Sequence, residues 1–371
     1  MSISVHPLFT RGGCVAAALA LSLLATAPLP SQTAVSCTAS ASSMTPAGWP
    51  VAAGVAPASA ATTPRAAAPL ARVADISLPG PSKRFDYQSI DPTTGRLYFS
   101  HMYGDRLDVF DTRAQKLVTS NEGFPGATGV LAVPEQHKVY VSVTGRHEVA
   151  VVDDRTLTVV AWIAGAEFPD GIAYAPAEQK VFVSDEHGDA DLVIDARTNA
   201  KVGLIPLGGE AGNTHYDAPS HCIVVAVQTK NELAAIDPAS DRVVQRYAMP
   251  CQHPHGFLID EPNRLAFVIC EGDSKLLVVD LRTMRTTATF TVAEGPDVLA
   301  FDPGLQRLYV ACESGSLAVF EECDGVLMSI GEYRAPHAHT VAADPGTHRV
   351  YLPLQDVDGK PVLRILVPTQ P

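Results

Sequence analysis

Aromatic residues are scarce in this chain of 371 residues, and basic residues are outnumbered by acidic ones. Phe, Trp and Tyr make up 6% of the sequence, and the net charge is −13. A chain this acidic is a poor nucleic-acid binder. The seven cysteines form no Cys-x-x-Cys pair, which excludes a zinc ribbon, a thioredoxin-type motif and c-type haem attachment. We therefore expect no nucleic-acid partner, no haem c and no nucleotide cofactor.

Long apolar runs are also missing. The run over residues 14–27 spans 14 residues, whereas a transmembrane helix needs about 20. It follows Arg11 and ends in Ala25-Thr26-Ala27, a small-x-small pattern typical of signal cleavage. The sequence predicts a signal peptide over residues 1–27, no integral membrane span, and export to the periplasm or the medium.

Charge is nearly absent from the next segment. Residues 28–72 are mostly Ala, Pro, Ser and Thr, with Arg65 and Arg72 as the charged residues. Such a composition buries too little surface to offset the entropy of ordering, so we expect a disordered tether. The 299 residues that follow Arg72 carry all 40 acidic residues and 24 of the 27 basic ones, a net charge of −16.

The remaining residues, 73–371, contain a repeat. A basic or polar residue, an aliphatic residue, an aromatic or aliphatic residue and two more apolar or small residues recur seven times, as in Lys138-Val139-Tyr140-Val141-Ser142. The third positions of these motifs are 42 or 43 residues apart: Tyr98, Tyr140, Phe182, Val224, Ala266, Tyr309 and Tyr351. Each unit also holds turn signals and further apolar stretches, as four short strands require.

Four strands every 42 residues predict an all-β fold, a seven-bladed β-propeller with four-stranded blades. Residues 73–78 read as a fourth strand without the three that should precede it, and the last unit stops after its third strand, residues 362–367. We expect the N-terminal strand to complete the C-terminal blade. The aspartates that end the outer strands, such as Asp153 before Thr156, are interpreted as turn formers.

The four-strand units, the aromatic-Val core and the Val-Ile-Asp-x-x-Thr ending resemble the YVTN or YncE-like β-propellers, a family of mostly exported bacterial proteins. The resemblance covers residues 73–371. It implies the propeller fold, and it implies no single activity because propellers carry unrelated functions on one scaffold.

Two sets of polar residues fall at equivalent places in the blades. The first set lies where each innermost strand begins, and it consists of Asp86, Thr128, Asp170, Asn213, His255, Asp297 and His339. The second set ends the second strand of each blade, and it consists of Met102, Thr144, Glu186, Gln228, Glu271, Glu313 and Gln355. Because neighbouring strands are antiparallel, both sets should surround the same mouth of the central channel.

The residue types at this mouth are those of a metal site. His nitrogen with Asp or Glu oxygen suits Zn²⁺ or Mn²⁺, and oxygen-rich sets suit Mg²⁺ or Ca²⁺. One divalent ion is the expected cofactor. Its candidate ligands are Glu186, His253, His255, Glu271, Asp297, Glu313, His337 and His339. The candidates for binding a small ligand are Asp86, Asp170, Asn213, Gln228, Asp297 and Gln355.

Two functions stay open. The first is an exported, monomeric propeller that binds a small ligand, a metal or a cell-envelope protein at this mouth. The second is a metal-dependent lactone hydrolase or lyase, with His255 or His339 as general base. In propeller lactonases and streptogramin-type lyases a divalent metal lies on the axis, and this chain is similar in where it places such side chains.

The cysteines allow one pairing near the mouth. Cys251 and Cys270 both belong to the fifth repeat at the polar face, so a disulfide between them is open in an oxidising compartment. Cys270 and Cys312 are equivalent positions in adjacent repeats, and either is an alternative soft metal ligand, although a buried structural role is the favoured interpretation.

Overall fold

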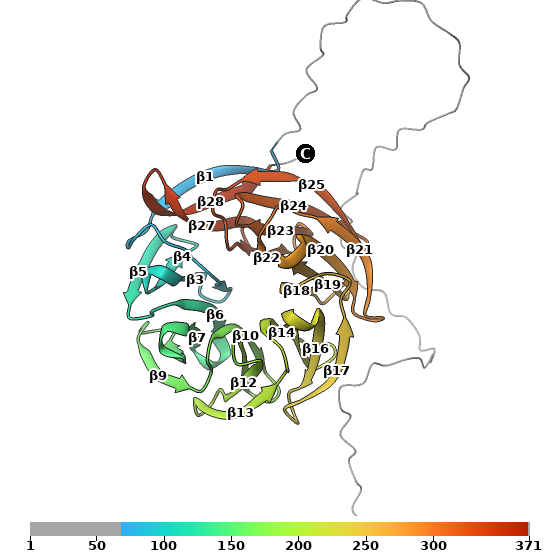
Figure 1. The fold of residues 1–371 in the computed structure, drawn as a ribbon. Coiled ribbons are helices and arrows are strands. Elements are labelled where there is room, and N and C mark those ends of the chain that lie inside the picture. The colour runs from blue at the N-terminus through green and yellow to red at the C-terminus, as the bar shows by residue number, and fades with distance from the viewer. Residues whose placement is uncertain (1–67, 370–371) are drawn as a thin grey trace, which may run out of the picture. The chain divides into compact units, whose positions relative to one another are not determined.

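The computed structural model describes residues 68–369, which form seven four-stranded antiparallel sheets arranged as a ring (Figure 1). The predicted signal peptide and most of the predicted tether lie outside the described residues. The strands of blades one to three are β2 (Gln88–Asp91), β3 (Arg96–His101), β4 (Arg106–Asp111), β5 (Lys116–Glu122), β6 (Ala127–Val133), β7 (Lys138–Val143), β8 (Glu148–Asp153), β9 (Val159–Ala164), β10 (Pro169–Ala175), β11 (Lys180–Asp185), β12 (Ala190–Asp195) and β13 (Ala200–Pro206).

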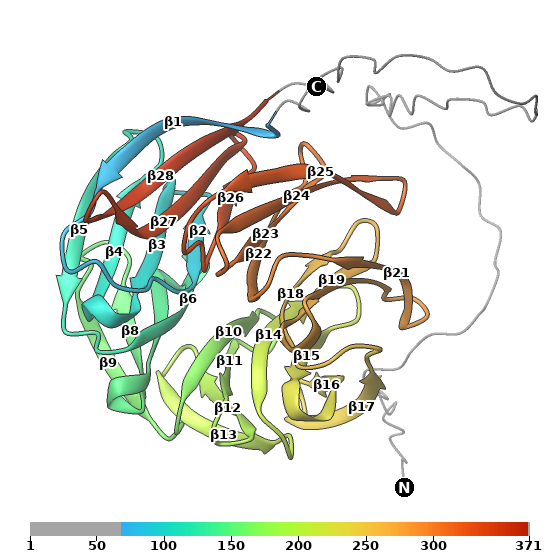
Figure 2. The ribbon, with the colours of Figure 1, turned by 45° about the horizontal axis from the view of Figure 1, so that its top comes forward.

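Blades four to six repeat the same order from the inside of the ring outward (Figure 2). Their strands are β14 (Ala211–Asp217), β15 (Cys222–Val227), β16 (Glu232–Asp237), β17 (Arg242–Ala248), β18 (Pro254–Asp260), β19 (Leu265–Cys270), β20 (Lys275–Asp280), β21 (Arg285–Thr291), β22 (Pro296–Asp302), β23 (Arg307–Cys312), β24 (Ser316–Cys323) and β25 (Val326–Arg334). Within residues 68–369, five single-turn 3-10 helices lie in the loops: η1 (Met102–Gly104), η2 (Pro134–Gln136), η3 (Thr144–Arg146), η4 (Gln228–Lys230) and η5 (Glu271–Asp273). Among the described residues, no helix is long and apolar enough to cross a bilayer.

Blade seven joins the two ends of the described chain, as the sequence predicts. Its strands from inside to outside are β26 (Ala342–Asp344), β27 (Arg349–Val357), β28 (Lys360–Pro368) and β1 (Leu70–Ser77). The blue β1 runs antiparallel along the red β28 in Figure 1. Arg364 on β28 donates two hydrogen bonds of 2.8 Å to the carboxylate of Asp75 on β1. The ring is therefore closed by backbone pairing and by an ion pair.

The apolar core lies between adjacent blades. The repeat's third position is at most 7% exposed in all seven blades, from Tyr98 to Tyr351. The cluster that seals the seam packs Phe85 and Phe110 of the first blade against Tyr351 and Ile365 of the last. Burying such side chains contributes about 2 kcal/mol each. The repeating apolar pattern thus stabilises each blade against its neighbour.

The basic residue that opens the repeat motif connects neighbouring blades at the face opposite the polar mouth. The Lys180 ammonium donates to the Pro238 carbonyl at 2.9 Å and pairs with Asp241 at 2.7 Å, and both partners belong to the next blade. Lys138 reaches Ala196 and Arg96 reaches Asp154 across the same 58-residue separation. The predicted turn formers behave as expected, since Asp153 accepts from the backbone N–H groups of Arg155 and Thr156.

Candidate metal and ligand site at the channel mouth

A β-bulge positions the first set of polar residues. In the innermost strand of blades two to six, two residues oppose one residue of the second strand, for example between Pro169 and Ile172 of β10. Asp170 is one of those two unpaired residues. A bulge bends the strand and redirects its side chain. The repeated bulge therefore places Thr128, Asp170, His255 and Asp297 at corresponding points of the ring. In blade four this point is occupied by Gly212, which follows the paired Ala211, so the predicted position of Asn213 in the set is wrong by one residue.

Small residues let the innermost strands approach one another at this level. A Cβ atom on Gly129 would lie 1.8 Å from the carbonyl oxygen of Asp170, and one on Gly256 would lie 2.0 Å from that of Asp297. Neither contact is sterically possible, so glycine is required after Thr128 and His255. The close approach draws the polar side chains of neighbouring blades together.

The result is a cavity of about 300 Å³, lined by side chains from several blades. The members of the two predicted sets that line it are Asp86, Met102, Thr128, Asp170, Glu186, His255, Glu271, Asp297 and Glu313. A volume of this size is at the lower end of small-molecule sites. The two predicted sets of polar residues thus share one mouth.

Two groups of three donors lie close enough to share an ion. His255, Glu271 and Asp297 form the first donor group, and Asp297, Glu313 and His339 form the second. Within each group the donor atoms lie within 4.8 Å of one another. Asp297 belongs to both. Its Oδ1 lies 3.5 Å from His255 Nε2, and its Oδ2 lies 3.1 Å from His339 Nδ1.

Arg84 is the main residue that the sequence interpretation missed. Its Nη1 lies 3.1 Å from Glu313 Oε1, and its Nη2 lies 3.6 Å from Asp297 Oδ2 and 3.9 Å from Asp86 Oδ2. Nη2 also lies 2.8 Å from Nε2 of His339. One guanidinium therefore contacts the whole second donor group and the neighbouring Asp86.

The repeat contains the signal that would have revealed Arg84. Arg84, Phe168, His253 and His337 all stand two residues before the first polar set. His253 and His337 have φ of 50° and 59°, in the left-handed region, and both are exposed. Arg84 and Phe168 have φ outside that region and line the cavity. At the position two residues before the first polar set, a left-handed φ thus goes with an exposed histidine, and other φ values go with a side chain that lines the cavity.

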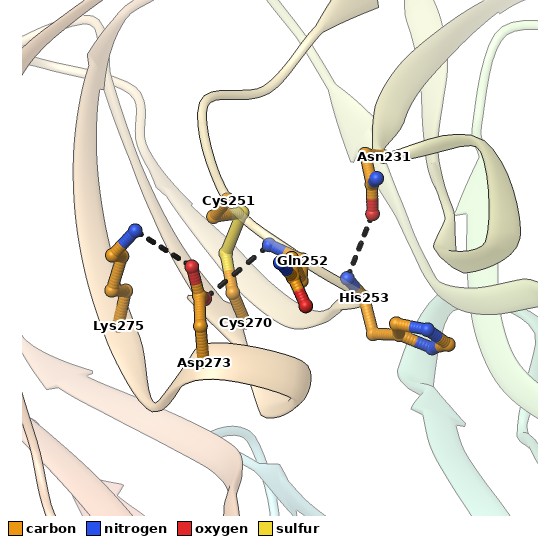
Figure 3. The surroundings of a disulfide bond; sticks show 7 residues. All are labelled: Asn231, Cys251, Gln252, His253, Cys270, Asp273 and Lys275. Atoms are coloured by element: carbon orange, nitrogen blue, oxygen red, sulfur yellow. Dashed lines mark hydrogen bonds and ion pairs between the residues drawn. A yellow bond between two sulfur atoms is a disulfide. The ribbon is translucent and has the colours of Figure 1, made fainter.

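The predicted ligands His253 and His337 consequently lie outside both donor groups. The backbone N–H of His253 donates to Asn231 at 2.9 Å, and Figure 3 shows its imidazole directed away from the neighbouring disulfide. Gln228 lies beside the site and donates to Glu186 at 3.0 Å. Asn213 accepts from the backbone of Thr214. Neither Asn213 nor Gln355 is among the cavity-lining residues.

Tyr87 is the second residue that was missed. It stands directly after Asp86, at the position where blades two, three and five have Gly129, Gly171 and Gly256. Its side chain lines the cavity and contacts residues of blades three and five. The hydroxyl donates to Asp170 Oδ2 at 3.1 Å and lies 3.5 Å from His255 Nε2. Burial and the charge of Asp170 raise the pKa of Tyr87 well above its usual value. The phenol is therefore a proton-bearing donor inside an acidic cavity.

The carboxylates set the protonation of the two histidines. Burial alone would lower the pKa of His255, but Glu271 and Asp297 raise it to about 9. Burial likewise opposes charge on His339, and Asp297 and Asp86 raise its pKa to about 10. Burial raises the pKa of Glu271 and of Asp170. The carboxylates therefore stabilise the charged form of both imidazoles.

Arg84 and a proton compete for one atom of His339. A guanidinium can only donate hydrogen bonds, so its 2.8 Å contact requires a lone pair on His339 Nε2. Nδ1 then carries the proton and donates to Glu313 at 2.7 Å. Two donors cannot face each other at this distance, so Arg84 and a proton on Nε2 are alternatives.

A disulfide joins Cys251 to Cys270 beside the first donor group (Figure 3). Cys270 directly precedes Glu271, so the bond fixes the backbone at a donor. The two sulfurs lie near Asp273 in a third cluster, but sulfurs bonded to each other are not thiolate ligands. Asp273 instead pairs with Lys275 at 2.6 Å. Cys312 is a buried free cysteine, and burial raises the pKa of its thiol to about 12.

Comparisons with known proteins support the architecture. No family model matches the chain, and no curated protein matches it. A solved structure of hydrazine synthase from Kuenenia stuttgartiensis is similar with a TM-score of 0.66 and 16% identity, over 79% of this chain and 96% of that one. Likeness at this identity concerns the fold alone. The seven-bladed propeller is thus shared with a known structure, and the YVTN or YncE-like resemblance remains a prediction.

Proposed function

We propose that this propeller binds one divalent metal ion at the first donor group, His255, Glu271 and Asp297. The observation that carries the proposal is the spacing of the donors. His255 Nε2 lies 3.5 Å from Asp297 Oδ1 and 3.9 Å from Glu271 Oε1. These distances are too long for good hydrogen bonds. Ligand atoms that share a tetrahedral ion at about 2.1 Å lie roughly 3.4 Å apart.

The charge balance on this side of the cavity supports the same conclusion. Within residues 68–369, neither Asp170, Glu186 nor Glu271 has a lysine or arginine within ion-pair distance. Asp170 is buried, Glu186 is half-buried and Glu271 is exposed, so this side of the cavity carries several carboxylates without a fixed cation beside them. Such a concentration of negative charge favours a bound cation. An imidazole nitrogen with two carboxylate oxygens favours Zn²⁺ or Mn²⁺ over Mg²⁺ and Ca²⁺.

Export is part of the proposal. The Cys251–Cys270 disulfide supports an oxidising compartment, where such bonds persist. A metal-loaded mouth would then face the periplasm or the medium, and a small ligand or an envelope protein would approach it there.

The test uses the full chain, freed of metal by a chelator and titrated with Zn²⁺ and Mn²⁺ by calorimetry. We expect about one ion per chain for the wild type, and binding at least about tenfold weaker for His255→Gln, as loss of one of three protein ligands implies. His137→Gln is the matched control, because His137 follows η2 at the opposite end of its blade. Equal affinity in the wild type and His255→Gln would overturn the proposal.

A metal-dependent hydrolase or lyase is the second candidate, and Tyr87 is the observation that favours it. A protonated phenol beside a metal site can stabilise an oxyanion that forms on a substrate. His339 fits the predicted role of general base poorly, because both of its nitrogens contact neighbouring side chains. His255 cannot act as the base while its Nε2 binds the ion, because its Nδ1 is buried. Turnover of a lactone panel that is lost with chelator and reduced by Tyr87→Phe would support this function. A metal-loaded protein inert on the panel would count against it.

A further inference from the structure

The second donor group repeats the chemistry of the first. Each group contains one histidine, one glutamate and Asp297. Glu271 and Glu313 are equivalent residues of adjacent blades, and His255 and His339 are equivalent residues two blades apart. A site able to hold an ion on one side of Asp297 therefore has a chemical copy on the other side.

Asp297 is oriented as a bridge between the two groups. Its two oxygens face different histidines, Oδ1 toward His255 at 3.5 Å and Oδ2 toward His339 at 3.1 Å. The Asp297 side chain is only 9% exposed. A carboxylate held this way is the usual link in two-metal sites, whose ions lie about 3.5–4 Å apart.

The two groups differ in one respect, which is Arg84. Its guanidinium contacts Glu313, Asp297 and His339 of the second group. In the described part of the chain, His255 is the one ion-pair partner of Glu271 in the first group. Its Nη2 lies 2.8 Å from Nε2 of His339, whereas the same imidazole meets Asp297 and Glu313 through Nδ1.

From these contacts we propose that Arg84 is a built-in cation that fills the second of two metal positions sharing Asp297, so that the protein holds one ion where its donors could hold two. This inference rests on the proposed metal binding at the first group. Arginine suits the role because its guanidinium stays charged and forms planar hydrogen bonds to carboxylates. Its fixed charge also repels a second divalent ion a few ångströms away.

The negative charges around Arg84 explain why a partly buried guanidinium is stable at this place in the cavity. Asp86, Asp297 and Glu313 surround Arg84, and the pKa of Arg84 is raised because these three carboxylates outweigh its burial. Removal of the guanidinium leaves three negative charges around one histidine. The chain would then gain the most by taking up a cation in its place.

The experiment compares the metal content of three forms of the full chain. After removal of metal, each is dialysed against Mn²⁺, and bound ions are counted by elemental analysis. We expect about one ion for the wild type, about two for Arg84→Met, and about one for Arg84→Lys, which keeps the charge. Electron paramagnetic resonance should detect magnetic coupling between two Mn²⁺ ions in Arg84→Met only.

A second variant tests the location of the added ion. Arg84→Met combined with His339→Gln should return to about one ion, because it removes a donor of the second group. Near-ultraviolet circular dichroism checks that each variant folds. If Arg84→Met is unfolded, Arg84→Gln supplies a neutral side chain that can still form hydrogen bonds.

The outcomes separate this inference from the proposed function. One ion in both the wild type and the folded neutral variant overturns the role of Arg84 and leaves the first site standing. No ion in the wild type, with one ion in Arg84→Met that is lost with His339→Gln, overturns the first site and supports the role of Arg84. No ion in any form overturns both.

Discussion

Tyr87 and Asp170 meet inside the cavity although they belong to the first and third blades. The phenol donates to the carboxylate at 3.1 Å, across 83 residues of sequence. Both side chains are buried, with Tyr87 8% and Asp170 4% exposed. The hydrogen bond therefore connects two blades that are not neighbours, within the same cavity as the candidate metal site.

Tyr87→Phe should lower the free energy of unfolding by about 1–2 kcal/mol, because it removes a hydrogen bond to a buried carboxyl group. Metal affinity should change little, since Tyr87 is not a proposed ligand. Urea denaturation and calorimetric titration measure the two effects. Tyr103→Phe is the control, because Tyr103 lines the same cavity with 57% exposure. An unchanged stability of Tyr87→Phe would contradict the prediction.

Asp191 should make the protein less stable as the pH rises. Neither carboxyl oxygen has a hydrogen-bond partner, and burial raises the pKa of Asp191 to about 8. A group whose pKa is higher in the folded state favours folding when protonated. That contribution is complete below about pH 4 and is lost as the pH rises to about 8.

Asp191→Asn should remove this dependence and stabilise the protein at pH 8 relative to the wild type, by an amount on the order of a few kcal/mol. Thermal unfolding of both forms between pH 5 and pH 8 gives the comparison. Glu294→Gln, at an exposed carboxylate, should leave the pH profile as it is. Parallel profiles for the wild type and Asp191→Asn would refute the assignment.

Lys180→Ala should weaken the contact between blades three and four. It removes the ion pair with Asp241 and the hydrogen bond to Pro238. Because the ammonium is partly buried, we expect a loss of about 1 kcal/mol, smaller at high salt. Urea midpoints at low and high ionic strength measure it. Lys360→Ala, at an exposed position, should change neither midpoint.

Removal of the disulfide should reduce both stability and metal affinity. The Cys251–Cys270 bond closes a loop with a sequence separation of 19. The loss of such a loop constraint costs about 3 kcal/mol. We expect Cys251→Ala with Cys270→Ala to bind Zn²⁺ more weakly, because Glu271 follows the bond directly. Cys312→Ala is the control for general cavity effects. Wild-type affinity in the double variant would show that the bond does not position Glu271.

The fold was predictable from the sequence because each blade repeats the same pattern of apolar and turn-forming residues. The buried third position, the turn aspartates and the surplus strand at the N-terminus are visible without coordinates. The two polar sets were also predictable except for Asn213, which lies one residue beyond the corresponding position in blade four, since antiparallel strands bring their ends to one face. These features depend only on which residues of the seven repeats are equivalent, and the 42-residue period of the sequence gives that equivalence.

The details of the site depend on backbone angles and side-chain directions that register does not define. Arg84 and His253 occupy equivalent positions, yet a left-handed φ at His253 gives it an exposed side chain while Arg84 lines the cavity. The shared role of Asp297 depends on the rotation of one carboxylate between two histidines. The reach of Tyr87 depends on a ring that crosses between blades. The spacing of residues in the sequence predicts none of these three side-chain directions.

The pairing of β1 with β28 also determines when the propeller ring can close during folding. Asp75 and Arg364 are 289 residues apart, and they meet in the same blade. Contacts at such separation require closure of a very long loop, which slows folding. During synthesis β1 emerges early and has no partner until the end of the chain follows. The ring therefore remains an open arc throughout translation, and its final blade forms only after the last strand has been made.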